Sequence, residues 1–365
     1  MNKIPVIVFF GYPSGIPTLG GLIWTKRVAD YIDQRGIFEV KKISNYIEID
    51  KTDVFFFVRY FRDALRGFIA NPNVAVLDSY GEANIILWIF LRLFKRKAKV
   101  LMVCHHYEPR IYQFKNNLLL KKFQKVYDLL INKVTKAMLL NSDLIITPSL
   151  SSANQLNSVL HQNILEKVVI AGVGINTFSL HNQKPKDIDF LCIGRIKKFE
   201  GLDIIWQLIR QQKPKASFVV CGHATVNDID RLRRLGIDHR GVVSEKEKID
   251  LYSRAKVFAF PSIIEGFCMA VAEALYAQIH VVAWKIPVFD ELYGHRCSQN
   301  IKLIEPKNYG DFAKQALLLT EPHVKKLYQQ DSTTHAKLAT EWEQVGEKVF
   351  LSIRDLIDRS MDKLE

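Results

Sequence analysis

The chain has 365 residues, of which 48% are hydrophobic and 24% are charged. This length and balance are typical of a globular protein of about two domains and exclude a disordered or fibrous chain. The formal net charge of +13 favours an anionic partner. The five cysteines form no CxxC or CxxH pair, so their spacing indicates neither a disulfide framework nor a zinc site.

The scattered cysteines favour a reducing compartment. The first apolar run ends at Gly11 without a small-residue cleavage site, so it predicts a core strand rather than a signal peptide. The most apolar later run, residues 84–94, is interrupted by Arg92 and is too short to cross a bilayer. We expect a cytoplasmic protein, and the inner face of the cell membrane is the second location to consider.

Short apolar runs alternate with amphipathic helical segments along the chain, a pattern that predicts an α/β fold with parallel sheets. Two sets of strands are expected. The first set is residues 5–10, 74–78, 99–104 and 144–149, and the second is residues 189–194, 217–222, 256–260 and 280–284. Residues 167–187, Gly-rich at the start and polar with prolines at the end, predict an interdomain linker.

The most informative stretch is residues 261–275, PSIIEGFCMAVAEAL, which holds Glu265 and Glu273. It follows a predicted buried strand and continues into a helix, so Glu265 is expected in the turn between them. A helix start offers unpaired N–H groups that suit phosphate oxygens, and Gly266 lets a ligand approach the backbone. The stretch therefore predicts a nucleotide-sugar site. The alternative is a pair of surface glutamates at an ordinary helix start.

This stretch resembles the signature P-S-x-x-E-G-F-G-x-x-x-x-E-A of the retaining glycosyltransferases of family 4, within the glycosyl transferases group 1. The matching residues are Pro261, Ser262, Glu265, Gly266, Phe267, Glu273 and Ala274. The resemblance implies that Glu265 contacts the transferred sugar, that the amides of residues 266–268 meet the diphosphate, and that Glu273 hydrogen-bonds the ribose. The chain departs from the pattern at Cys268, where the family has glycine, and at Gln278 and His280, where it has small Gly and Pro.

Residues 194–201, GRIKKFEG, resemble the phosphate-binding turn G-R-x-x-x-x-K-G of the same family. Arg195 matches the arginine, whereas Glu200 stands at the lysine. The resemblance implies that Arg195 neutralises the donor diphosphate, and Lys198 is the substitute we expect for the missing cation. Gly222 ends the next strand, where the family approaches the nucleotide. The alternative for this turn is a solvated basic loop.

In the N-terminal half, Gly20 and Gly21 open a helix after the first strand and resemble the glycine pair of the same family, whose loop lines the donor and acceptor pocket. His105 ends the strand at residues 99–104 and aligns with a family histidine, which implies a hydrogen bond to the transferred sugar. Two alternatives stay open. A Gly-Gly turn is often a plain connection, and a histidine at a strand end can merely satisfy a backbone carbonyl.

These resemblances cover nearly the whole chain and imply the GT-B fold: two facing Rossmann-like domains with parallel sheets and an interdomain cleft. We expect an acceptor-binding domain at residues 1–176 and a nucleotide-sugar-binding domain at residues 177–335. The resemblance further implies that a C-terminal helix, residues 336–365, crosses back to the N-terminal domain.

The implied activity is a retaining glycosyltransferase of hexosyltransferase type (EC 2.4), acting on a lipid-linked glycan or cell-surface polysaccharide precursor. No metal and no cofactor are expected besides the nucleotide-sugar substrate. The alternatives are a nucleotide-sugar epimerase of the same fold and a non-catalytic nucleotide-sugar-binding subunit. No recognised nucleic-acid motif accompanies the charge, so no nucleic-acid partner is expected.

Aromatic and basic residues occur together in residues 55–68, 87–99 and 114–138. Such mixtures predict peripheral contact with an anionic membrane. The alternative is that the aromatic residues are core and the lysines form a solvated face.

Overall fold

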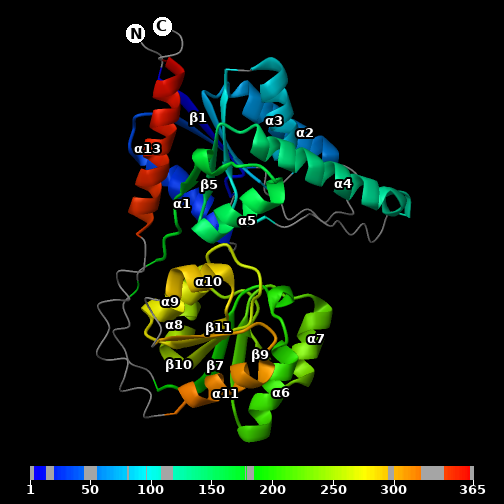
Figure 1. Cartoon of the computed structure of the whole chain (residues 1–365), viewed down its shortest axis with the longest axis vertical. Coiled ribbons are helices and arrows are strands. Elements are labelled where there is room, and N and C mark those ends of the chain that lie inside the picture. The colour runs from blue at the N-terminus through cyan, green and yellow to red at the C-terminus, as the bar shows by residue number, and fades with distance from the viewer. Residues whose placement is uncertain are drawn as a thin grey trace. The chain divides into compact units, whose positions relative to one another are not determined.

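The computed structural model describes residues 4–13, 20–44, 56–79, 82–95, 97–107, 118–176, 178, 185–294, 300–321 and 341–361. The chain divides into two compact units, the first made of Met1–Val173 and Trp342–Glu365, the second of Gly174–Glu341. Each unit holds one six-stranded sheet (Figure 1). All paired strands run parallel, which confirms the predicted α/β class.

The first sheet has the strand order β2-β1-β3-β4-β5-β6. Its strands are β1 (Val6–Phe10), β2 (Glu39–Ile43), β3 (Val74–Asp78), β4 (Lys99–Val103), β5 (Leu144–Thr147) and β6 (Val168–Ile170). The helices of this unit are α1 (Gly20–Gln34), α2 (Phe56–Ile69), α3 (Glu82–Phe94), α4 (Leu118–Leu140), α5 (Leu150–Leu160) and α13 (Trp342–Met361), with the 3-10 turn η1 (Leu165–Lys167).

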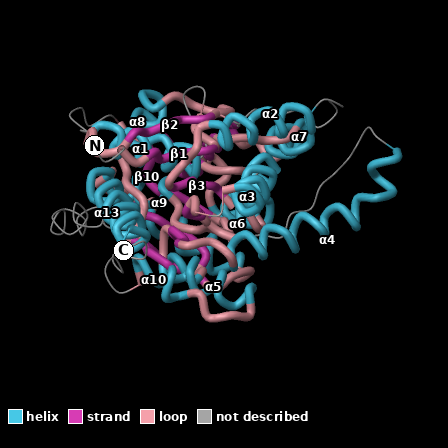
Figure 2. Tube along the Cα trace, turned by 90° about the horizontal axis from the view of Figure 1, so that it is seen from above, coloured by secondary structure: helices cyan, strands magenta, loops and turns pink. Residues whose placement is uncertain are grey.

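Every residue of β1 is buried, as expected for a parallel strand covered on both faces. Helices α1 and α13 lie on one side of the sheet, and α2, α3 and α4 lie on the other (Figure 1). The terminal helix packs on α1, where the Tyr31 hydroxyl donates to Glu347 at 2.7 Å. It also contacts the segment between α1 and β2, where the ring centroids of Phe38 and Phe350 are 5.4 Å apart. One end of α4 projects beyond the rest of this unit (Figure 2).

The second sheet has the order β12-β11-β10-β7-β8-β9. Its strands are β7 (Ile188–Ile193), β8 (Phe218–Cys221), β9 (Asp238–His239), β10 (Ala255–Phe260), β11 (His280–Trp284) and β12 (Ile301–Ile304). The helices are α6 (Leu202–Gln212), α7 (Val226–Arg234), α8 (Glu245–Arg254), α9 (Met269–Tyr276), α10 (Pro287–Tyr293) and α11 (Tyr309–Leu319), with the 3-10 turn η2 (Ile196–Lys198).

The linker prediction is wrong at its start, because residues 168–170 form β6 at the edge of the first sheet. The remainder of that segment lies partly outside the described residues. Strands β2, β9 and β12 were also not expected. All four missed strands are edge strands. Strands β2 and β12 carry lysines within the strand, and β9 and β6 are only two and three residues long, so none gives the apolar run of four or more residues that marks a buried strand. The eight expected strands are the inner ones.

Candidate functional site

The predicted donor motifs meet at one point of the second sheet. Strand β7 is the first strand of this sheet in the chain, and it lies between β8 and β10. The loops after β7 and β10, residues 194–201 and 261–268, therefore leave the sheet side by side, at the switch point where α/β sheets bind ligands. The backbone N–H of Glu200 donates to the carbonyl of Pro261 at 2.8 Å, which joins the two loops.

Two glycines make the floor of this site. Gly222 has φ of 133°, and a Cβ on it would lie 1.9 Å from the carbonyl oxygen of Gly194. A side chain at position 222 is thus excluded both by conformation and by space. The N–H of Gly222 donates to Gly241 at 2.7 Å, and the N–H of Gly194 donates to Cys221 at 2.9 Å. Backbone is therefore packed against backbone where the two strands end.

Arg195 precedes η2 with extended backbone angles and is half-buried. Among the described residues, its guanidinium makes no hydrogen bond or ion pair with another side chain. The backbone of Lys198 ends η2, but its side chain lies outside the described part of the structure. The neighbouring Lys197 is exposed. Among the described residues of this loop, Arg195 is therefore a half-buried cation and Lys197 an exposed one.

Glu265 lies in the turn between β10 and α9, as predicted, and is half-buried. The hydroxyl of Ser262 donates to its Oε1 at 2.8 Å, which orients the carboxylate. Gly266 and Phe267 are buried behind it. Cys268 has φ of 68°, the left-handed conformation that favours the glycine found at this position of the resembling family.

Glu273 is enclosed, with 4% of its side chain exposed. Its Oε1 accepts from the ammonium of Lys248 at 2.9 Å, and its Oε2 accepts from the hydroxyl of Tyr252 at 3.0 Å. Burial raises the pKa of Glu273, and the ammonium of Lys248 opposes that rise. The carboxylate is therefore fixed by two neighbours from α8 before any ligand arrives.

Within the first unit, the predicted residues Gly21 of α1 and His105, which follows β4, lie close together. His105 lies against α1, since a Cβ on Gly21 would come within 2.9 Å of its ring. The ring of Trp24 contacts it edge-on at 5.5 Å. Asp78 Oδ2 is 3.9 Å from His105 Nε2. Burial lowers the pKa of His105 although the charge of Asp78 opposes this, so the imidazole is neutral at neutral pH.

The position of Gly20 as the first residue of α1 agrees with the expectation that the glycine pair opens this helix. Residues 14–19 of the preceding loop lie outside the described residues. Asp78 was not predicted from the sequence. An acidic residue at the end of an apolar strand was a usable signal, because the next apolar strand in the chain leads to His105. Lys248 and Tyr252 were also missed.

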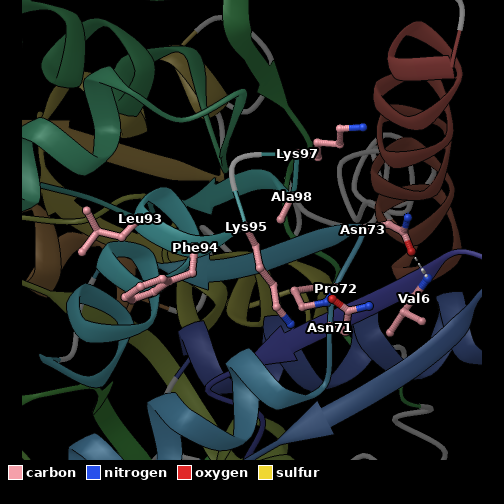
Figure 3. A pocket seen from close by; sticks show the side chains of 9 residues that line it. All are labelled: Val6, Asn71, Pro72, Asn73, Leu93, Phe94, Lys95, Lys97 and Ala98. Atoms are coloured by element: carbon pink, nitrogen blue, oxygen red, sulfur yellow. Dashed lines mark hydrogen bonds between the residues drawn. The ribbon is translucent and has the colours of Figure 1, made fainter. Parts of the chain in front are cut away.

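A cavity of about 580 Å³ lies elsewhere in the first unit, lined by Val6, Asn71, Pro72, Asn73, Leu93, Phe94, Lys95, Lys97 and Ala98 (Figure 3). These residues flank the amino-terminal ends of β1, β3 and β4, the edge of the sheet opposite His105. The cavity is therefore separate from the surroundings of His105. In the described part of the chain, no group of three or more His, Cys, Asp or Glu is placed to hold a metal ion.

Solved structures define the class of fold. Sucrose-phosphate synthase from Thermosynechococcus elongatus is similar with a TM-score of 0.73 and 14% identity, covering 97% of this chain and 100% of that chain. HepE of Anabaena, in complex with UDP and glucose, is similar with a TM-score of 0.66 and 13% identity, covering 95% and 99%. At these identities the likeness shows the fold, which is GT-B, as predicted.

Sequence comparison then gives the family. Residues 176–331 match the family model described as Glycosyl transferases group 1. The chain is also 26% identical over 166 residues to the O-antigen biosynthesis glycosyltransferase WclY of Escherichia coli, covering 43% of this chain and 46% of that protein. The match thus spans about half the length of the curated relative. The resemblance to group 1 glycosyltransferases is confirmed over the second unit, while family 4 and a retaining outcome stay predictions.

Proposed function

We propose that the chain is a retaining glycosyltransferase of hexosyltransferase type, which moves a sugar from a nucleotide-sugar donor to an acceptor hydroxyl. The observation that carries the proposal is the meeting of residues 194–201 with residues 261–268 at the switch point of the second sheet. The family match of residues 176–331 and the UDP and glucose bound to HepE support a nucleotide-sugar as the donor.

The leaving diphosphate is the group that these loops suit. Arg195 supplies a planar, permanently charged donor, and the first turn of α9 supplies unpaired N–H groups after Glu265. Lys198 is the second cation of the proposal. Preorganised charge of this kind stabilises a departing phosphate. We expect these groups to act without a metal ion or an added cofactor.

The sugar transfer itself proceeds on one face of the donor. The bond from the anomeric carbon to the phosphate oxygen breaks, the acceptor oxygen bonds to the same carbon from the same side, and the acceptor proton passes to the leaving phosphate. Glu265, held by Ser262, contacts the transferred sugar, and Glu273 binds the ribose. The neutral imidazole of His105 hydrogen-bonds the sugar, with Asp78 3.9 Å from its Nε2.

The acceptor is a lipid-linked glycan or cell-surface polysaccharide precursor, a proposal that the O-antigen biosynthesis glycosyltransferase WclY supports. Within the described residues, no helix is both long and apolar enough to span a bilayer. A lipid-linked acceptor lies at the membrane, and the proposal includes a surface of this chain that docks there.

Helix α2 offers such a surface. Val58, Phe61, Leu65 and Ile69 are exposed and recur every three or four residues, so they form one apolar stripe. The basic residues beside the stripe are Arg59, Arg62 and Arg66. Apolar side chains next to arginines suit acidic lipid headgroups. Val126, Leu129 and Leu130 of α4 are also exposed and offer the same kind of surface. Residues 55, 96 and 114–117 of the predicted segments lie outside the described residues.

The test is release of the nucleoside diphosphate from UDP-, GDP- and ADP-sugars, with and without a membrane extract that contains lipid-linked acceptors. Acceptor-dependent release is expected, and Glu265→Gln should lower it by about 100-fold or more. Glu247→Gln, an exposed glutamate of α8, is the matched control and should keep full activity. Nucleotide binding without turnover would indicate a binding subunit instead, and conversion of the donor sugar without an acceptor would indicate an epimerase.

A further inference from the structure

Lys248 is a buried lysine that no motif predicts. Only 13% of its side chain is exposed, and its ammonium lies 2.9 Å from Oε1 of Glu273 and 2.9 Å from Oε1 of Glu245. Lysine is almost never buried unless it is paired. Although burial disfavours the charged form, the charge of Glu273 raises the pKa of Lys248. The ammonium is therefore charged, and of its two carboxylate partners Glu273 is the buried one.

The two neighbours of Glu273 hold different oxygens. Lys248 donates to Oε1 and Tyr252 donates to Oε2, so the carboxylate cannot rotate without losing one of them. An ionised carboxylate has about four acceptor sites, roughly two on each oxygen. About one site on each oxygen is thus left, a pair of acceptors that matches the adjacent 2′- and 3′-hydroxyls of a ribose.

We propose that Lys248 is a positioning residue of the nucleotide site, whose ion pair presents the Glu273 carboxylate to both hydroxyls of the donor ribose. This inference rests on the proposed function, in which Glu273 binds the ribose. It has a consequence that a merely structural role lacks. If Lys248 only joined α8 to α9, its loss would weaken the binding of ribonucleotides and of 2′-deoxyribonucleotides equally.

The experiment measures binding by isothermal titration calorimetry with UDP, GDP and ADP and with their 2′-deoxy counterparts. The wild type should prefer the ribonucleotide by about tenfold, the worth of one hydrogen bond to a charged group. Lys248→Met keeps the aliphatic stem and removes the ammonium. This variant should bind the ribonucleotide about tenfold more weakly and lose most of the preference, whereas Lys248→Arg should retain it.

Glu245→Gln is the matched control, because it removes the charge of the other partner of Lys248. The Glu245 side chain is 56% exposed, and this variant should leave the preference for the ribonucleotide unchanged. The double variant Lys248→Met with Glu273→Gln guards against misfolding, since it leaves no unpaired buried charge. Its preference should equal that of Glu273→Gln alone. An unchanged preference in Lys248→Met, or equal weakening of both nucleotide types, overturns this proposal only. A wild type that binds none of the six nucleotides overturns the proposed function and this inference together.

Discussion

The hydroxyl of Tyr309 donates a hydrogen bond of 3.1 Å to Oε1 of Glu200, at the position where the resembling family carries a lysine. The Tyr309 ring also fills the space beside Gly201, where a Cβ would come within 2.0 Å of it. The loop after β7 is therefore fastened to the first residue of α11 through an anion. Glu200, which departs from the family pattern, is thus held in place by Tyr309.

Glu200→Lys restores the cation of the family pattern. We expect it to strengthen binding of a nucleoside diphosphate by about 30-fold, because it removes an anion and adds a cation, and each charge near a surface site contributes about 1 kcal/mol. Calorimetric titration with UDP, GDP and ADP measures this. Glu200→Gln removes the anion without adding a cation and separates the two effects. Equal affinities in all three proteins would mean that residues 194–201 do not face the phosphates.

Gln278→Gly should stabilise the second unit. Gln278 follows α9 with φ of 56°, and the N–H groups of Gln278 and Ile279 donate to Leu275 and Ala274, both at 3.0 Å. This is the Schellman ending, in which glycine is preferred. Since a left-handed residue other than glycine costs about 1 kcal/mol, the free energy of unfolding should rise by up to that amount in urea denaturation.

Two controls accompany the glycine variant. Gln278→Ala keeps the conformational strain and should give no gain. Gly241→Ala introduces the strain at a residue whose φ is 66° and where no neighbouring atom lies within 4 Å of the new Cβ. Its free energy of unfolding should therefore fall by about 1 kcal/mol. Stabilisation by the alanine as well as the glycine at position 278 would refute the conformational explanation.

Asp189 should make the free energy of unfolding fall at low pH. Its carboxylate accepts from Lys256 at 2.7 Å and from Lys213 at 2.9 Å. Although burial opposes the charge, these ammonium groups lower its pKa below the ordinary value of 3.8. A group with a lowered pKa in the folded state stabilises the fold above its unfolded value, and this contribution is lost as the pH falls through the folded pKa.

Asp189→Asn should therefore cost about 2 kcal/mol at pH 7, and its difference from the wild type should shrink below pH 3.8. Urea denaturation at several pH values checks both. Asp230→Asn is the control, since its ion pair with Arg233 is exposed and should contribute less than about 0.5 kcal/mol. A difference that does not change with pH would contradict this account of Asp189.

The apolar stripe of α2 should carry membrane binding. Phe61→Ser together with Ile69→Ser removes two exposed apolar side chains, and binding to phosphatidylglycerol vesicles should weaken by about tenfold or more. Vesicle flotation measures it, with phosphatidylcholine vesicles to isolate the contribution of charge. Val226→Ser on α7, where the valine is 74% exposed, is the control. Equal binding by all three proteins would exclude α2 as the docking surface.

The sequence predicted the inner strands because each is a short apolar run that both faces of the sheet bury. Strand β10, expected at residues 256–260, begins one residue earlier and ends where predicted. The edge strand β6 was mistaken for linker, since it has only three residues and a glycine follows at position 172. A run this short is below the four to eight residues by which a strand is recognised in a sequence.

The site was predictable where residues adjoin along the chain, as in the turn that holds Glu265. It was not predictable where the contact depends on how helices pack. Lys248 and Tyr252 precede Glu273 by 25 and 21 residues, and neither spacing indicates that α8 delivers both side chains to one carboxylate. The same holds for Asp78 and His105, which the order of β3 and β4 in the sheet brings together.

The contact between α1 and α13 bears on how the chain is made. Tyr31 and Glu347 are 316 positions apart, and Val345, Val349 and Ile353 of α13 are buried. During synthesis, all of residues 174–341 leave the ribosome before the helix that completes the first unit. The second unit can thus fold while the apolar side of α1, on which α13 later packs, is still exposed. We expect a nascent chain stalled before residue 342 to hold a protease-resistant second unit and a first unit that chaperones recognise.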